Sequence, residues 1–225
     1  MRLAQIARSE ILSVKNRTNS LSEILSPSYC KRYLDLFDYE MSLKLDKEKP
    51  GSGSTTHMSI IDSQGNAASV TTTNGEGCGY IIPGTGIMMN NMLGEDDLNP
   101  YGFHNWETTK RMSTMMSPTI VIGDSGPELV LGSGGSNRIR SAIKQVILNK
   151  FTNNMNLEEA IKAPRIHLEE NIIHCEPGIN TDKLNFPWST IHYWHEKNLF
   201  FGGVNAVTPT NAVGDPRRSG YGLVC

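Results

Sequence analysis

Two threonines and a histidine follow a flexible stretch at residues 51–57, GSGSTTH, and these residue types are suited to chemistry. A threonine hydroxyl becomes a nucleophile when a base takes its proton, and an N-terminal threonine carries that base as its own α-amino group. Thr55 acquires such an amine if the bond after Ser54 is cut. The same stretch is also typical of a domain linker that ends at a strand, since Gly/Ser runs are flexible and threonine favours strands. The stretch alone leaves both interpretations open.

The following residues predict a hairpin that brings a second hydroxyl to Thr55. Residues 55–62, TTHMSIID, and 66–74, NAASVTTTN, have the composition of strands. Between them, residues 63–65, SQG, form a three-residue connection with glycine where a left-handed conformation is favoured. Counting back from this turn pairs Thr55 with Thr73, or with a neighbour one residue away if the hairpin contains a bulge. Cross-strand threonine pairs also occur in ordinary sheets, so the pairing by itself does not establish a site.

A glycine-rich turn, GSGGSNRI at residues 132–139, connects a predicted strand to a predicted helix. Such a turn exposes backbone N–H groups and directs the positive end of the helix dipole at whatever binds there. The turn lacks the lysine of a phosphate loop and the spacing of a dinucleotide-binding fingerprint. It therefore indicates either an anion-binding or oxyanion-binding nest or a turn that is merely tight.

The other candidate groups point to structural roles. The six histidines do not cluster at metal-ligand spacings, and we expect no metal site. His57 follows Thr55 by two positions on one strand face, about 7 Å away, and is interpreted as structural. His192 and His195 have no neighbouring carboxylate or cysteine pattern that would complete a site. The acidic run at 95–97 either binds an amino group or a metal or forms a solvated turn.

Composition excludes several functional classes. Lysine plus arginine number 21 and aspartate plus glutamate 23, for a net charge of -2, so no basic field attracts nucleic acid or anionic lipid. No apolar run approaches the roughly 18 residues of a membrane span. The first residues, MRLAQIARSEIL, lack the apolar core of a secretory signal. The four cysteines are scattered and are expected to be unpaired thiols.

Hydrophobic periodicity predicts the elements that hold these groups. We expect an amphipathic helix over about residues 1–15, a helix that Ser26 caps and Pro27 begins, and a polar connector at 46–54. A helix is predicted from Ile139 to Phe151, and another from Asn156 to Ala163. Further strands are predicted at 81–90, 117–124, 127–133, 172–176 and 204–209. This mixture of helices and hairpins indicates an α+β layered fold.

Taken in order, these motifs resemble the small-subunit region of the γ-glutamyltranspeptidases. The matching segments are GSTTHMSIID, GNAASVTTTN, GTGIMMNNML, MSPTIVI, GSGGSNRI, APRIH and GDPRRSG. The resemblance covers about residues 55–220. It implies that 55–225 is the small-subunit catalytic region and that 1–54 is the end of the large-subunit region with a flexible processing segment. It also implies a four-layer αββα N-terminal-nucleophile hydrolase fold and self-cleavage between Ser54 and Thr55.

The resemblance assigns roles residue by residue. The family's nucleophile corresponds to Thr55, and its hydroxyl partner corresponds to Thr73, which the hairpin count already places opposite. The paired glycines that stabilise the oxyanion match Gly134 and Gly135. Asn74 is the nearest match to a substrate-contacting asparagine, one position early.

Part of the family pattern is altered in this chain. Many members have a glutamine and then an aspartate where Met92 and Glu95 stand, and a pair of serines where Thr114 and Met115 stand. The family's carboxylate-binding arginine lies upstream, in a region that these residues do not include. Glu95 and Thr114 are still expected to contact the substrate. The catalytic part of the pattern is retained, and the part that selects the γ-glutamyl head departs from it.

The function that the resemblance implies is hydrolysis or transfer of γ-glutamyl groups through an acyl-threonine intermediate. The substrate is a small γ-glutamyl compound such as glutathione, no cofactor or metal is needed, and the remaining large-subunit region is a partner. Family members suggest a periplasmic or extracellular site, and a cytoplasmic one stays open. Two alternatives remain: a related N-terminal-threonine acylase with another acyl substrate, and an inactive truncated fragment.

Overall fold

The computed structural model describes residues 3–4, 6–7, 10, 21–35, 55–99, 101–169, 171–181 and 190–225. The chain divides into two compact units. The smaller unit comprises Met1–Lys49, Leu168–His174 and Asn180–His192, and the larger comprises Pro50–His167, Cys175–Ile179 and Tyr193–Cys225. Most of the helix expected over residues 1–15, the connector at 46–54 and Ser54 lie outside the described residues.

The smaller unit contains the helices α2 (Leu21–Ile24) and α3 (Pro27–Asp35). As predicted, α3 begins at Pro27, and the Ser26 hydroxyl oxygen accepts a hydrogen bond from the Tyr29 amide at 3.2 Å. Strands β5 (Ile166–Glu169), β6 (Ile172–Cys175) and β7 (Thr190–Tyr193) form a three-stranded sheet in that order. The strand expected at 172–176 is therefore confirmed.

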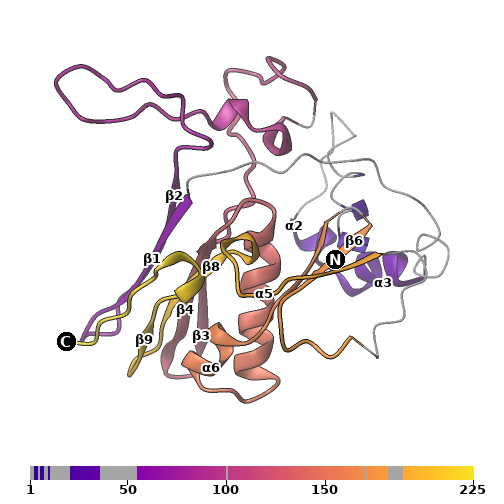
Figure 1. Ribbon diagram of the computed structural model, residues 1–225, viewed down its shortest axis with the longest axis vertical. Coiled ribbons are helices and arrows are strands. Elements are labelled where there is room, and N and C mark those ends of the chain that lie inside the picture. Colours follow the sequence, from indigo (N-terminus) through magenta and orange to yellow (C-terminus); the bar gives the residue numbers. More distant parts are fainter. Residues whose placement is uncertain are drawn as a thin grey trace. The chain divides into compact units, whose positions relative to one another are not determined.

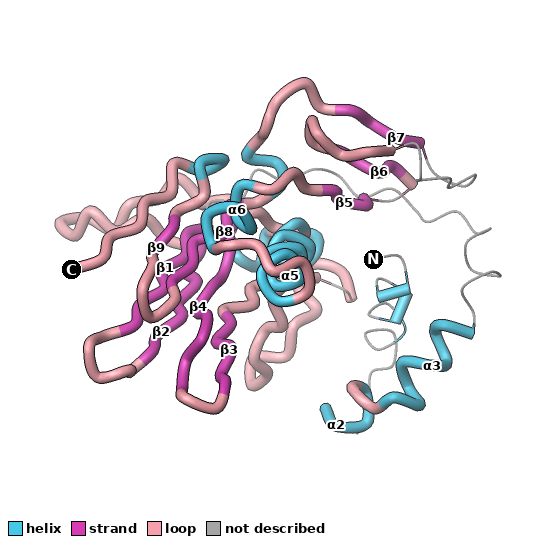
Figure 2. The backbone as a smooth tube through the Cα atoms, turned by 90° about the horizontal axis from the view of Figure 1, so that it is seen from below, coloured by secondary structure: helices cyan, strands magenta, loops and turns pink. Residues whose placement is uncertain are grey.

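The larger unit is built from two sheets and a helical layer (Figures 1 and 2). Strands β1 (Thr55–Ile61) and β2 (Ala67–Thr73) form an antiparallel hairpin. A second sheet has the order β3–β4–β8–β9. Its strands are Thr119–Gly123, Gly126–Gly134, Gly203–Val207 and Ala212–Val213. The hairpin packs against β4 and β8, and the helix α5 (Arg138–Phe151) packs against the same two strands (Figure 2).

Local sequence explains the hairpin. The Asp62 amide donates to the Asn66 carbonyl at 3.0 Å, and the Gly65 amide donates to the Asp62 carbonyl at 3.1 Å. Gly65 has a φ of +83°, the left-handed conformation that glycine adopts without steric cost. The predicted three-residue connection and its register are confirmed, because Thr55 pairs with Thr73.

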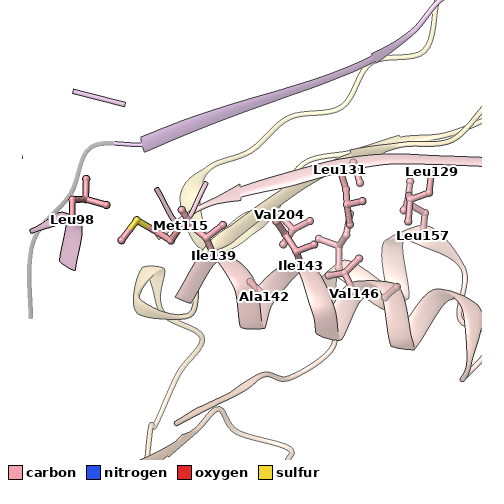
Figure 3. Packing of buried hydrophobic residues seen from close by; sticks show 13 residues of the cluster. Leu98, Met115, Leu129, Leu131, Ile139, Ala142, Ile143, Val146, Leu157 and Val204 are labelled. Carbon is pink, nitrogen blue, oxygen red and sulfur yellow. The ribbon is translucent and has the colours of Figure 1, made fainter. Parts of the chain in front are cut away.

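The hydrophobic core lies between the second sheet and its helices (Figure 3). Leu129 and Leu131 alternate along β4 with the side chains that face the hairpin, while Ile139, Ile143 and Val146 recur at helical spacing on α5. The short helix α6 (Leu157–Lys162) closes this core. Asn156 caps α6 with a capping box, as the sequence predicts.

One predicted strand is wrong. Residues 81–90 form no named strand and contain only an isolated bridge between Ile81 and Met88. Gly84 and Gly86 have φ values of +76° and +69°, so the chain turns back within the segment instead of extending. The segment is the protruding loop that follows β2 in Figure 1. It continues into the 3₁₀ turns η1 (Met92–Gly94) and η2 (Asp96–Leu98).

In the described residues, the combination of helices and antiparallel sheets agrees with the expected α+β class. None of the described helices combines the length and the hydrophobicity that a membrane crossing requires. All four cysteines are free, as expected.

Candidate functional site

Thr55 and Thr73 form a hydroxyl pair at the open end of the hairpin. The Thr55 hydroxyl donates a hydrogen bond to Thr73 Oγ1 at 3.1 Å, and the Gly75 amide donates to the same oxygen at 3.0 Å. Thr73 Oγ1 therefore acts as the acceptor in both hydrogen bonds. The lone pairs of the Thr55 hydroxyl oxygen are not used in its bond to Thr73. The arrangement suits a nucleophilic oxygen whose position a neighbouring hydroxyl fixes.

This pair lines a cavity of about 360 Å³. The described residues around it are Thr55, Thr56, Thr72, Thr73, Asn74 and Arg218. These residues are all of polar types, and they include one cation and no carboxylate. Asn74, which the resemblance matches to a substrate-contacting asparagine, lines the same cavity.

The glycine-rich turn lies directly against the nucleophile candidate. A Cβ atom on Gly134 would lie 2.5 Å from the Thr55 carbonyl oxygen, so only glycine permits this approach of β4 to β1. Gly135 has a φ of +132°, and a Cβ there would lie 2.8 Å from Gly202 Cα. The turn leads into α5, whose first residue is Arg138. The turn therefore lies against Thr55 and immediately precedes the N-terminus of α5, the positive end of that helix dipole.

Glu95 and Thr114 are not among the described residues that line the cavity. Glu95 follows a segment that lies beside Asn74, since the Asn91 amide donates to the Asn74 carbonyl at 2.8 Å. Burial, followed by the charges of Asp97 and Glu76, raises the pKa of Glu95. Thr114 Oγ1 accepts a hydrogen bond from the Met116 amide at 3.2 Å, a local turn contact.

The two methionines that replace polar family residues belong to the hydrophobic core. Met115 is 5% exposed and packs in the core cluster next to Ile139, as Figure 3 shows, and Met92 is partly buried against the same cluster. Their apolar side chains therefore contribute packing at these positions. At Met92 and Met115, where this chain departs from the family pattern, burial in or against the core favours an apolar side chain.

His57 is buried between the two sheets, in agreement with its interpretation as structural. Its Nδ1 lies 2.7 Å from Thr71 Oγ1, and its Nε2 lies 2.8 Å from Ser59 Oγ. The Ser59 hydroxyl donates to the Asn205 carbonyl at 3.2 Å, so Nε2–H is the donor to Ser59 and Nδ1 accepts from Thr71. Burial lowers the pKa of His57 to about 4. Both ring nitrogens are occupied, and His57 does not serve as the base for Thr55.

Arg218 is the cavity residue that sequence reasoning missed. In the sequence it stands only as part of the motif GDPRRSG, and 163 positions separate it from Thr55. Its neighbour Arg217 belongs to a buried network in which Asp215 accepts from Arg165 Nη2 at 2.7 Å and from Arg217 Nη1 at 3.2 Å. No signal in the sequence distinguishes the arginine that lines the cavity from the one that is buried in the network.

The described residues contain no group of three or more histidine, cysteine, aspartate or glutamate side chains that could hold a metal ion. The rings of His174 and His192 lie 5.4 Å apart between centroids. The chemistry that the described cavity offers therefore depends on hydroxyl, amide and guanidinium groups.

Comparison with known proteins identifies close similarity to one family. The family model described as Gamma-glutamyltranspeptidase matches residues 1–225. The glutathione hydrolase proenzyme of Escherichia coli (strain K12) is 31% identical over 181 residues, covering 72% of this chain and 31% of that protein. The Acylase ACY 1 proenzyme of Pseudomonas sp. (strain SE83) is 35% identical over 130 residues, covering 57% of this chain and 23% of that protein.

A solved structure shows the same fold. The γ-glutamyltranspeptidase from Pseudomonas nitroreducens complexed with L-DON superposes with a TM-score of 0.63 at 28% identity, covering 76% of this chain and 99% of that chain. The expected N-terminal-nucleophile hydrolase fold is thereby confirmed. The chain spans about a third of the length of the curated E. coli relative, 31% of it.

Proposed function

Because the chain belongs to the γ-glutamyltranspeptidase family, we propose that residues 55–225 are the catalytic region of an enzyme that hydrolyses or transfers γ-glutamyl groups. The observation that carries the proposal is the hydroxyl pair of Thr55 and Thr73, 3.1 Å apart in a polar cavity beside the Gly134–Gly135 turn. The substrate is a small γ-glutamyl compound such as glutathione.

The first step is self-cleavage. Thr55 Oγ attacks the carbonyl carbon of Ser54, the C–N bond to Thr55 breaks, and the released amine takes a proton. Water then hydrolyses the resulting ester and frees the hydroxyl. An α-amino group ordinarily has a pKa of about 7.7 to 8.0, so the new amine of Thr55 can act as the base for the same hydroxyl near neutral pH.

In the catalytic cycle, Thr55 Oγ attacks the γ-glutamyl carbonyl, and the amine of the substrate leaves. Thr73 orients the Thr55 hydroxyl through the hydrogen bond that it accepts. Backbone amides of the Gly134–Gly135 turn stabilise the oxyanion, each donor being worth about 3 kcal/mol. Water or an acceptor amine then removes the acyl group from Thr55.

The partner is the part of the large-subunit region that these residues do not include. The outward face of the hairpin carries apolar side chains, with Met58 53%, Ile60 56% and Val70 42% exposed. The opposite side of β1 carries polar residues such as the buried His57, so apolar side chains are exposed where a sheet with one face in water usually carries polar ones. This apolar face fits a surface that another part of the precursor covers. Ile60→Asp is expected to weaken co-purification with that region, whereas Gln64→Lys, in the exposed turn, is expected to leave it unchanged.

The decisive test is the intact mass of the purified protein. The 24.9 kDa chain, or a precursor that contains the full large subunit, is expected to split before Thr55, and Thr55→Ala is expected to abolish the split. Thr73→Ala should slow cleavage by about tenfold or more, because it removes an orienting hydrogen bond. Thr72→Ala is the matched control, since Thr72 also lines the cavity but the Thr55 hydroxyl donates to Thr73 and not to Thr72. Absence of cleavage in both proteins, or equal effects of the two threonine variants, contradicts the proposal.

An acylase with another acyl group is the second candidate. The described lining of the cavity offers a cation for a carboxylate but no carboxylate for the ammonium of a glutamyl head. Processed enzyme should therefore be assayed on the p-nitroanilides of γ-glutamate and of glutarate, which differ only in that ammonium. Preference for the γ-glutamyl compound supports the first candidate, and preference for the glutaryl compound supports the second.

A further inference from the structure

Arg218, in the lining of the Thr55 cavity, is anchored by its neighbours. It ends the 3₁₀ turn η4 (Pro216–Arg218), which Asp215 caps by accepting from the Arg217 amide, and Asp215 is itself buried and bonded to Arg165. The aliphatic part of Arg218 lies flat on Gly203, where an added Cβ would come within 2.7–2.8 Å of it. The backbone and the side-chain stem of Arg218 are therefore fixed by packing.

The guanidinium group of Arg218 has unused hydrogen-bonding capacity. Its Nη2 donates to the Leu199 carbonyl at 3.1 Å, but its buried Nε has no hydrogen-bond partner. Among the residues that the structure describes, no carboxylate forms an ion pair with Arg218, whereas Arg165 and Arg217 are both paired with buried acids. The charge of the guanidinium is therefore not neutralised by a carboxylate of the described residues, and a bound anion would supply that counter-charge.

The charges around Arg218 do not supply that anion. Burial is the main cause that lowers the pKa of Arg218, and the positive charge of the neighbouring Arg138 lowers it further. Asp215 opposes this effect, but its two oxygens already accept from Arg165 and Arg217. Among the described residues, Arg218 is therefore the one charged side chain in the cavity lining, and no acid of that lining faces it.

The position of the guanidinium relates this charge to the reacting atoms. Arg218 lines the cavity together with Thr55, Thr73 and Asn74. Its Nη2 lies 3.7 Å from the place that a Cβ would take on Gly135. The cation thus borders both the nucleophile candidate and the turn beside it.

We propose that Arg218 binds a carboxylate of the substrate in the Thr55 cavity, an inference that rests on the function proposed above. A guanidinium binds a carboxylate through paired, charge-assisted hydrogen bonds, and partial burial strengthens them. Arg218 is thereby a specificity-determining residue that this region of the chain supplies. The carboxylate belongs either to the acyl donor or to the acceptor.

The primary experiment measures binding and needs no turnover. Glutarate is titrated into the protein by calorimetry, with neutral glutaramide as the uncharged probe. Arg218→Gln is expected to weaken glutarate binding about tenfold or more, Arg218→Lys is expected to weaken it less, and glutaramide binding should not change. Arg111→Gln is the matched control, because it removes the same charge from an exposed position. Equal glutarate affinity in the Arg218→Gln and Arg111→Gln proteins, or no saturable binding to the wild type, overturns the proposal.

Kinetics of processed enzyme then identify the source of the carboxylate. If it belongs to the donor, Arg218→Gln raises KM for γ-glutamyl-p-nitroanilide but not for its α-carboxamide. If it belongs to the acceptor, the KM for glycylglycine rises instead. A fall in kcat with both donors and no change in KM assigns Arg218 to the oxyanion and overturns the proposal. A protein that binds glutarate through Arg218 and yet neither cleaves itself nor turns over these donors would give a different result. That result contradicts the proposed function and leaves the carboxylate-binding role of Arg218 in place.

Discussion

Acidification is expected to destabilise the larger unit through His57. The ring is 4% exposed, and each nitrogen already has a hydrogen-bond partner. Protonation would place a second N–H opposite Thr71, whose hydroxyl currently donates to Nδ1. The charged ring is therefore poorly solvated and poorly bonded, which is why burial lowers the pKa of His57 to about 4.

The magnitude follows from the difference between the folded and unfolded states. The unfolded chain takes up the proton near the ordinary histidine pKa of 6.5, and the folded chain takes it up near 4, so the unfolded state binds more protons between these values. Stability is therefore full above 6.5 and decreases as the pH falls toward 4. The total loss is about 3 kcal/mol, of which about 2 kcal/mol has occurred at pH 5.

Urea unfolding, followed by tryptophan fluorescence, measures this loss. Trp106 and Trp194 lie in the same unit as His57, and Trp194 stacks on Phe200 with ring centroids 5.0 Å apart. The unfolding free energy is compared at about pH 7 and about pH 5 in the wild type, in His57→Gln and in His195→Gln, whose histidine is exposed. We expect the decrease in the wild type and in His195→Gln to exceed that in His57→Gln by about 2 kcal/mol.

A decrease of the same size in all three proteins would refute this reasoning, because the acid sensitivity would then come from other groups. A larger decrease in His57→Gln would do so as well. Each protein is compared with itself at the two pH values, so the result does not depend on how much the substitution destabilises the fold at neutral pH.

Two further predictions concern the polar network and the glycine turn. Asp215→Asn is expected to lower the unfolding free energy, measured by urea titration, by about 3 to 5 kcal/mol, because the buried Arg165 and Arg217 lose a shared counter-charge. The control, Asp124→Asn at an exposed position, should change the unfolding free energy by less than about 0.5 kcal/mol. Similar losses in the two variants would contradict the role of the network. Gly134→Ala is expected to slow self-cleavage, measured by intact mass, because the added Cβ would lie 2.5 Å from the Thr55 carbonyl oxygen. The control, Gly65→Ala, has a strained backbone but open space around its Cβ, so it should lower the unfolding free energy by about 1 kcal/mol and leave cleavage unchanged. Equal cleavage in the two variants would show that the close approach of Gly134 is not needed.

Short-range features of this protein were predictable from its sequence. The pairing of Thr55 with Thr73 follows from a turn of three residues and from the period of two along each strand. The start of α3 at Pro27 and the capping of α6 by Asn156 follow from hydrogen bonds within one helical turn. The order of motifs likewise indicated the family and the layered fold. In the hairpin and at the two helix starts, the deciding interactions join residues that are close in the chain.

The packing of distant elements decided the rest. Residues 81–90 have strand-forming side chains, but their one bridge, between Ile81 and Met88, lies within the segment, and no named strand pairs with them. Propensity therefore did not determine their structure. Met115 occupies a family substrate position in the sequence, and the core beside α5 buries it. Arg218 and Arg217 are adjacent and chemically identical, yet one lines the cavity and the other is buried with acids. Which of the two faces Thr55 depends on how η4 packs on β8 and on how β8 packs on β1. The strands β1 and β8 are far apart in the chain, and local sequence does not encode their contact.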